Sequence, residues 1–188
     1  PGGGTRPMKD RVRETLFDLL GTTVRGAVAL DLFAGTGALG FEAVSRGAAA
    51  AIFAERHFPT ADALRRTARD LGVDDRCEIR PGDVLLWPRR MPDLPTAAPW
   101  LVFISPPWAM FASDHDRHAD LLALVAAVRR SAPAGSTIVV EADTGFDPQV
   151  LPDPSGWQSR AIPPAVLHIS RPAADGTPTP PGSGIFGT

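Results

Sequence analysis

The sequence predicts an α/β protein built on a mostly parallel, seven-stranded sheet with helices on both faces. Short apolar segments typical of buried strands alternate with amphipathic helical segments, and Gly or Pro separates most of them. The chain has 188 residues, of which 44% are hydrophobic and 21% are charged. It is therefore long enough to bury a core, and its composition is that of a globular protein.

The elements follow one another in a regular order. A first helix is expected over residues 10–20, because its apolar residues fall on one face and Gly21 follows them. Further helices are expected over residues 38–46, 60–71 and 117–131. Five buried strands are expected over residues 27–33, 50–55, 77–80, 100–105 and 136–141. A final antiparallel pair of strands is expected over residues 157–162 and 166–170, joined by Pro163 and Pro164.

The sequence predicts one folded domain without a membrane span, a disulfide or a metal site. We assign residues 1–171 to the folded domain, and the Pro- and Gly-rich residues 172–188 to a disordered tail. No apolar run is long enough to cross a bilayer, and Cys77 is the single cysteine, which excludes an intrachain disulfide. His115 and His118 lack a third ligand, so no metal site is expected. We expect a cytoplasmic monomer that binds no membrane.

A glycine-rich turn joins the first predicted strand to the next helix. It covers residues 31–40, with the sequence DLFAGTGALG. Gly35 and Gly37 permit a tight turn and the close approach of a ligand, and Gly40 permits close packing of the helix. Such a turn is typical of nucleotide-cofactor sites, and it suits both a dinucleotide and S-adenosylmethionine (SAM).

Carboxylates follow three successive strands and favour SAM. Asp31 would repel the pyrophosphate of a dinucleotide, whereas it would attract the positive ammonium and sulfonium groups of SAM. Glu55 could hold a ribose hydroxyl, and Asp83 could accept a hydrogen bond from the adenine amine. A dinucleotide-dependent oxidoreductase is also opposed by the absence of a Lys, Tyr or Cys near the turn that could act in catalysis.

The tetrapeptide Ser105-Pro106-Pro107-Trp108 directly follows the fourth predicted strand. Its prolines fix an extended backbone and remove two N–H donors, which leaves carbonyl acceptors, a hydroxyl and an indole face. These groups fit an exocyclic amine on a planar base that has left its stack. The Ser105 side chain and the Pro106 carbonyl would accept the amine hydrogens, while Trp108 stacks on the ring. We expect these four residues to be catalytic.

The chain resembles the bacterial 16S rRNA (guanine-N2)-methyltransferases of the RsmD type over roughly residues 5–171. Three segments carry the resemblance: residues 5–17 (TRPMKDRVRETLF), 30–40 (LDLFAGTGALG) and 42–48 (EAVSRGA). The resemblance implies a Rossmann-like class I methyltransferase fold, SAM as methyl donor and N2 of a guanine in 16S rRNA as acceptor. The rRNA would be free or part of the small ribosomal subunit.

The same resemblance implies roles for individual residues. Residues 105–108 would hold the target base. Residues of the glycine-rich turn and two strand ends would bind SAM, namely Asp31, Phe33, Ala34, Gly35, Gly37, Glu55 and Asp83. Basic residues near the start of the chain would contact RNA phosphates, namely Arg6, Lys9, Arg11 and Arg13.

Departures from the family pattern leave alternatives open. The family usually has Asp or Asn at the position of Ser105 and Tyr or Phe at that of Trp108. Serine also occurs there in DNA amino-methyltransferases, so methylation of cytosine N4 or adenine N6 in DNA is one alternative. A non-catalytic RNA-binding module for ribosome assembly is another. We expect the family's basic N-terminal hairpin to be missing ahead of Pro1, and Pro163 and Pro164 stand where the family usually has an aromatic–Gly pair.

Overall fold

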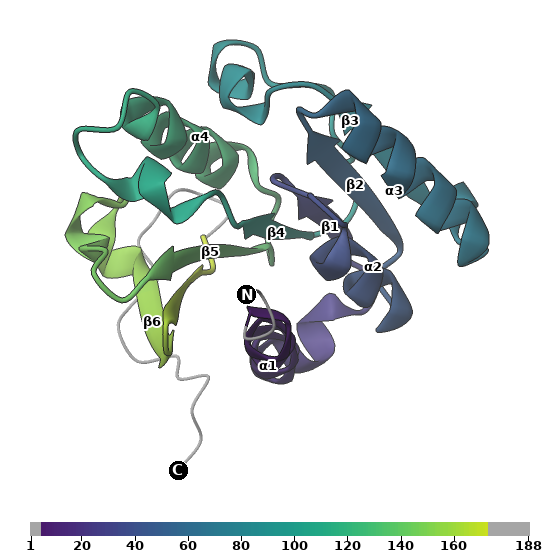
Figure 1. Ribbon diagram of the computed structural model, residues 1–188, viewed down its shortest axis with the longest axis horizontal. Coiled ribbons are helices and arrows are strands. Elements are labelled where there is room, and N and C mark those ends of the chain that lie inside the picture. The colour runs from purple at the N-terminus through teal and green to yellow at the C-terminus, as the bar shows by residue number, and fades with distance from the viewer. Residues whose placement is uncertain (1–4, 173–188) are drawn as a thin grey trace.

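The centre of the fold is one sheet, built from strands that the computed structural model places within residues 5–172, the part of the chain that it describes. The strands are β1 (Val28–Asp31), β2 (Ala50–Glu55), β3 (Cys77–Pro81), β4 (Trp100–Ile104), β5 (Thr137–Asp143), β6 (Trp157–Ile162) and β7 (Ala165–Ser170). Their order across the sheet is β3-β2-β1-β4-β5-β7-β6. Strands β1 to β5 are parallel, and β7 runs antiparallel to both of its neighbours (Figure 1).

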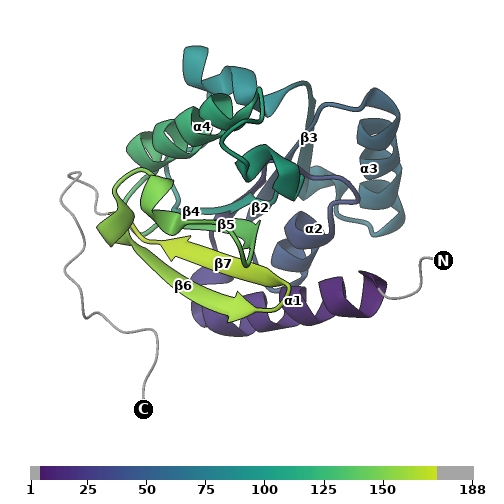
Figure 2. The same ribbon diagram turned by 60° about the vertical axis from the view of Figure 1, so that its left-hand side comes forward.

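Helices cover both faces of this sheet. The α-helices within the described residues are α1 (Thr5–Leu20), α2 (Ala38–Ser45), α3 (Phe58–Asp70) and α4 (His118–Ser131). Figure 2 shows α1 and α4 on opposite sides of the sheet. Apolar side chains of α1, α2 and α3 share one core cluster, and those of α4 belong to another. The layers are therefore helix, sheet and helix, as expected when parallel strands are joined by crossover helices.

Strands β1, β2, β4, β5 and β6 contribute to both cores, because successive side chains of a strand point to opposite faces. In β4, Trp100, Val102 and Ile104 belong to the core beneath α4, whereas Leu101 and Phe103 belong to the core beneath α1 and α2. The central parallel strands are buried on both faces. This explains why their sequences are continuously apolar instead of alternating with polar residues.

The predicted fold class and order of elements are confirmed, with small differences at the ends. Helix α1 begins at Thr5, five residues before the predicted start, and Pro7 lies in its first turn, where its missing N–H costs no hydrogen bond. Two short 3₁₀ helices, Val84–Arg89 and Trp108–Phe111, were not predicted, because segments of one or two turns are too short to show a periodic pattern.

The predicted tail and the predicted lack of a membrane span can be compared with the structure only in part. The proposed tail falls almost entirely on residues 173–188, which lie outside the described residues, so the boundary at residue 171 stays a prediction. Within residues 5–172, no helix combines the length and apolar composition that a membrane crossing requires.

Candidate active site

A cleft with a volume of about 810 Å³ lies at the carboxyl edge of the parallel strands. The segments that follow β1, β2, β3 and β4 line it, together with Arg13 of α1, Glu141 of β5 and Pro164 from the β6–β7 turn. Strand β1 lies between β2 and β4, so the order of the strands reverses at this point. Open α/β sheets bind their ligands in such a crevice, which makes this cleft the candidate active site.

The glycine-rich turn lines the cleft with Gly35 but not with Gly37. Both glycines have a positive φ, +51° at Gly35 and +76° at Gly37. At Gly37, a Cβ atom would lie 2.6 Å from side-chain atoms of Leu64 and Phe41. Gly37 therefore allows α2 to start close to α3. This geometry favours a packing role for Gly37 over the expected role in lining the cofactor site. The other six residues expected to bind the cofactor line the cleft.

Asp31 is a buried carboxyl group at the base of the cleft, with 2% of its surface exposed. Its Oδ2 accepts a hydrogen bond of 3.0 Å from the backbone N–H of Gly40. Burial raises the pKa of Asp31 from 3.8 to about 7, the Gly40 hydrogen bond opposes this rise, and the nearby charge of Glu55 adds to it. A cation in the cleft would stabilise the ionised carboxylate.

Glu55 fixes the glycine-rich turn against the end of β2. Its Oε2 accepts a hydrogen bond of 2.9 Å from the Gly35 N–H, and its Oε1 accepts one of 2.7 Å from the His57 N–H. Each carboxylate oxygen has a further lone pair that can accept a hydroxyl hydrogen. The sequence suggested the contact with a ribose, but it gave no sign of this support for the turn.

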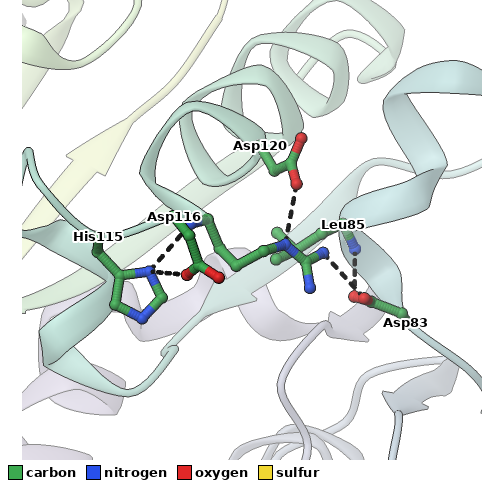
Figure 3. Close-up of polar contacts among 6 residues, drawn as sticks. Asp83, Leu85, His115, Asp116 and Asp120 are labelled. Atoms are coloured by element: carbon green, nitrogen blue, oxygen red, sulfur yellow. Dashed lines mark hydrogen bonds and ion pairs between the residues drawn. The ribbon is translucent and has the colours of Figure 1, made fainter.

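Asp83 lies in a network of polar contacts that reaches α4 (Figure 3). Its Oδ1 accepts a hydrogen bond of 3.0 Å from the Leu85 N–H, and its Oδ2 accepts one of 2.9 Å from Arg117. Arg117 also donates to Asp120 at 2.9 Å. The hydrogen bonds to Asp83 and Asp120 raise the pKa of the Arg117 guanidinium. An adenine amine would therefore share Asp83 with a cation that no sequence motif indicated.

Ser105 is paired with a carboxylate on the neighbouring strand. Its hydroxyl donates a hydrogen bond of 2.7 Å to Oε2 of Glu141. The register of β4 and β5, in which Ile104 lies opposite Val140, places the next residue of each strand side by side. Glu141 also lines the cleft, but it was not among the predicted site residues. Its place at the carboxyl end of a buried strand, like that of Asp31, is the signal that could have found it.

The rest of the tetrapeptide also lines the cleft. Pro106 is buried, whereas Pro107 is exposed and Trp108 is half-buried. Trp108 begins a 3₁₀ helix and packs against both core clusters at the edge of the sheet. Its ring is thus held in place and still partly accessible, as a stacking platform requires.

The four basic residues expected to contact RNA all lie on α1. Arg13 lines the cleft and forms an ion pair of 3.1 Å with Asp10, and its Nε lies 3.9 Å from a carboxylate oxygen of Glu42. Arg11 is exposed. The side chains of the other two, Arg6 and Lys9, lie outside the described part of the structure. The predicted phosphate-binding cluster therefore stays a prediction.

The charge of the cleft fits a cationic ligand. Four carboxylates line it, Asp31, Glu55, Asp83 and Glu141, against two guanidinium groups, Arg13 and Arg56. The ionised form of the buried Asp31 lacks a cationic partner among the ion pairs of the described residues. Apolar side chains between these groups would cover a planar ring, among them Leu32, Val84, Leu85 and Met110. A pyrophosphate would meet the carboxylates unfavourably, so the geometry agrees with SAM and not with a dinucleotide.

Comparisons with known proteins agree with the resemblance stated above. The model of the family described as Conserved hypothetical protein 95 matches residues 1–159. "Ribosomal RNA small subunit methyltransferase D" of Haemophilus influenzae is 36% identical over 109 residues, which are 56% of this chain and 54% of that protein. The matched part of the chain spans about half the length of such curated relatives.

Solved structures confirm the Rossmann-like methyltransferase fold. The structure of YhhF from Escherichia coli superposes with a TM-score of 0.69 at 24% identity, covering 92% of this chain and 91% of that one. An RNA methyltransferase from Salinibacter ruber, solved in complex with S-adenosyl-L-homocysteine, superposes with a TM-score of 0.61 at 19% identity. That match covers 85% of this chain and 89% of the other.

Proposed function

The chain belongs to the family described as Conserved hypothetical protein 95, and from this premise we propose that it transfers a methyl group from SAM to N2 of a guanine in 16S rRNA. Curated relatives carry the name of ribosomal RNA small subunit methyltransferase D. The observation that carries the proposal is that one cleft brings together the buried carboxyl of Asp31 and the tetrapeptide at residues 105–108. A cation site thus adjoins a site for a planar base.

Three carboxylates of the cleft would hold the cofactor. Asp31 would face the positive amino-acid part of SAM, because a buried carboxylate gains most from a nearby cation. Glu55 would accept from the ribose and Asp83 from the adenine amine, each through lone pairs that their backbone partners leave available. When bound, SAM supplies an electrophilic methyl group to this cleft.

The tetrapeptide would hold the guanine. Because Ser105 donates its own hydrogen to Glu141, the lone pairs of its oxygen are available to accept an amine hydrogen. The Pro106 carbonyl would accept the other, which would concentrate the nitrogen lone pair as the amine becomes pyramidal. Stacking on Trp108 would contribute about 1–3 kcal/mol toward holding the base outside its stack. Positioning of the amine supplies much of the rate in such a site.

The RNA itself would be held by the basic residues of α1. Arg13 lies at the cleft and Arg11 is exposed on the same helix, which also carries Arg6 and Lys9. Neutralising phosphates with such residues makes binding dependent on salt. We propose a cytoplasmic monomer that acts on 16S rRNA, free or in the small-subunit particle.

Nucleoside mass spectrometry of rRNA and DNA tests this function. The nucleic acids are taken from cells that lack the gene and from the same cells after the gene is restored. The proposal expects N2-methylguanosine in 16S rRNA to fall on deletion and to return on restoration. If N4-methylcytosine or N6-methyladenine in DNA follows the gene instead, the DNA amino-methyltransferase suggested by Ser105 is the correct function. A SAM-binding protein that changes no nucleoside would be a non-catalytic module.

A further inference from the structure

Glu141 is a fourth carboxylate of the cleft, in addition to the three that would hold the cofactor, and it lies beside Ser105, where the base is expected. It lies near the end of β5, between the fully buried Val140 and Ala142, and its own side chain is half-buried in the cleft. Its Oε2 accepts the hydrogen of Ser105 at 2.7 Å. A charged group at such a place is costly unless polar partners compensate for the lost water. Ser105 provides one partner, and the second carboxylate oxygen can accept more.

Ser105 and Glu141 together form a pair of adjacent acceptors. The serine oxygen keeps lone pairs after donating its hydrogen, and the carboxylate accepts only. Such a pair is complementary to two adjacent N–H donors on the edge of a flipped base. It is not complementary to an edge on which a donor adjoins an acceptor, because a ring-nitrogen lone pair would face the carboxylate charge.

We propose that Glu141, acting with Ser105, selects guanine by accepting hydrogens from its N1 and N2. Guanine carries N1–H next to its N2 amine, so both atoms donate. In adenine, the N6 amine adjoins the unprotonated N1, and in cytosine the N4 amine adjoins the unprotonated N3. The inference rests on the proposed function, and it assigns the choice of base to a residue outside the tetrapeptide.

This assignment also accounts for serine at position 105. The Asp or Asn that is usual at this position in the family that the chain resembles would supply a carboxylate or amide oxygen from the end of β4 itself. Here, Glu141 supplies a carboxylate from the adjacent strand, and the register of β4 and β5 brings it to the serine. Serine at this position is therefore compatible with guanine and does not by itself indicate a cytosine or adenine substrate.

The test uses the full chain and three variants. Glu141→Gln removes the charge, and the exchanged pair Ser105→Asp with Glu141→Gln moves one carboxylate from β5 to β4. Asp143→Asn is the matched control, because Asp143 lies two residues further along β5 and caps the Gly145 N–H outside the cleft lining. Methyl transfer to small subunits from cells lacking the gene is followed by nucleoside mass spectrometry, and SAM affinity is measured by calorimetry.

We expect the parent protein to form N2-methylguanosine and Glu141→Gln to slow this about tenfold to a hundredfold, the usual effect of losing a hydrogen bond to a charged group. SAM affinity should stay within about twofold, because no cofactor contact is removed. The exchanged pair should recover most of the rate, which a merely structural role for Glu141 would not allow. Asp143→Asn should match the parent.

Several outcomes would overturn the inference. A parent rate in Glu141→Gln, or an exchanged pair as slow as Glu141→Gln alone, would show that no carboxylate is needed here. N6-methyladenosine or N4-methylcytidine as the parent product would show that the pair reads another edge. If the parent methylates no rRNA, the proposed function fails, and titration with GMP and AMP decides on Glu141 separately. A preference for GMP that Glu141→Gln loses supports the inference, and no preference overturns it.

Discussion

Replacing Asp31 by Asn should remove a loss of stability that the parent suffers as the pH rises, and it should weaken SAM binding. Burial raises the folded-state pKa of Asp31 from 3.8 to about 7. Between these two pH values, the folded protein therefore holds a proton that the unfolded chain has released. The parent therefore loses stability as the pH rises through this range, and the loss is complete above a pH of about 7. Asparagine carries no such charge.

The size of the effect follows from the two pKa values. A rise from 3.8 to about 7 corresponds to about 4 kcal/mol, at about 1.4 kcal/mol for each pKa unit. Between about pH 5 and about pH 8, the free energy of unfolding of Asp31→Asn should gain about 2–3 kcal/mol relative to the parent. The asparagine amide also changes the free energy of unfolding by a constant amount, because its buried N–H₂ needs hydrogen-bond partners. This amount is the same at every pH, so it does not affect the predicted pH dependence.

Urea denaturation without cofactor at several pH values measures this difference, and calorimetry gives the affinity for SAM. Asp62→Asn is the control, because it makes the same substitution at an exposed carboxylate on α3, away from the cleft. We expect Asp31→Asn to bind SAM about tenfold to a hundredfold more weakly than the parent does. Equal pH dependence in parent and variant, or unchanged SAM affinity, would refute the reasoning about the buried carboxyl group.

Three further substitutions test other parts of the site. Trp108→Ala should keep SAM affinity within about threefold and slow methyl transfer by more than about tenfold, because the base loses its stacking partner. Trp108→Phe should keep most of the rate, and transfer at the parent rate by Trp108→Ala would exclude stacking. Arg117→Ala should lower the free energy of unfolding by at most about 1 kcal/mol in urea, because its ion pair with Asp83 is partly exposed. SAM should bind no more weakly, because the variant leaves Asp83 free to accept from the adenine amine, and weaker binding would contradict this role of Asp83. Gly40→Ala should cost about 1–3 kcal/mol in the same assay, because its Cβ would lie 2.3 Å from Phe53, and an unchanged midpoint would mean that α2 shifts freely.

The parts of the site that follow from local sequence were predictable. Parallel strands end at one edge of the sheet, so Asp31, Glu55 and Asp83 had to lie near one another once the strands were recognised. The turn at Gly35 was predictable for the same reason, because its place after a strand indicates its conformation. These inferences needed only the order of elements along the chain.

The contacts between distant segments were not predictable from one sequence. Ser105 and Glu141 are 36 residues apart, and their hydrogen bond depends on the register of two strands. Strands that are buried on both faces lack the alternation of polar and apolar residues from which a register could be read in one sequence. Arg117 and Asp83 are 34 residues apart and meet because α4 starts beside the segment after β3. The orientation of Gly37 away from the cleft likewise depends on the packing of Leu64, a side chain of another helix.

The strand order has a consequence for the synthesis of the protein. The final hairpin enters the sheet with its second strand first: β7 pairs with β5, and β6 reaches the sheet only through β7. While the ribosome still holds the residues of β7, one edge of β5 remains open, and its apolar segment Ile138–Val140 can pair with another nascent chain. The cleft wall at Pro164 is completed at the same moment. The residues up to 170 must therefore have left the ribosome before the edge of β5 is protected from aggregation and the cleft is closed on this side.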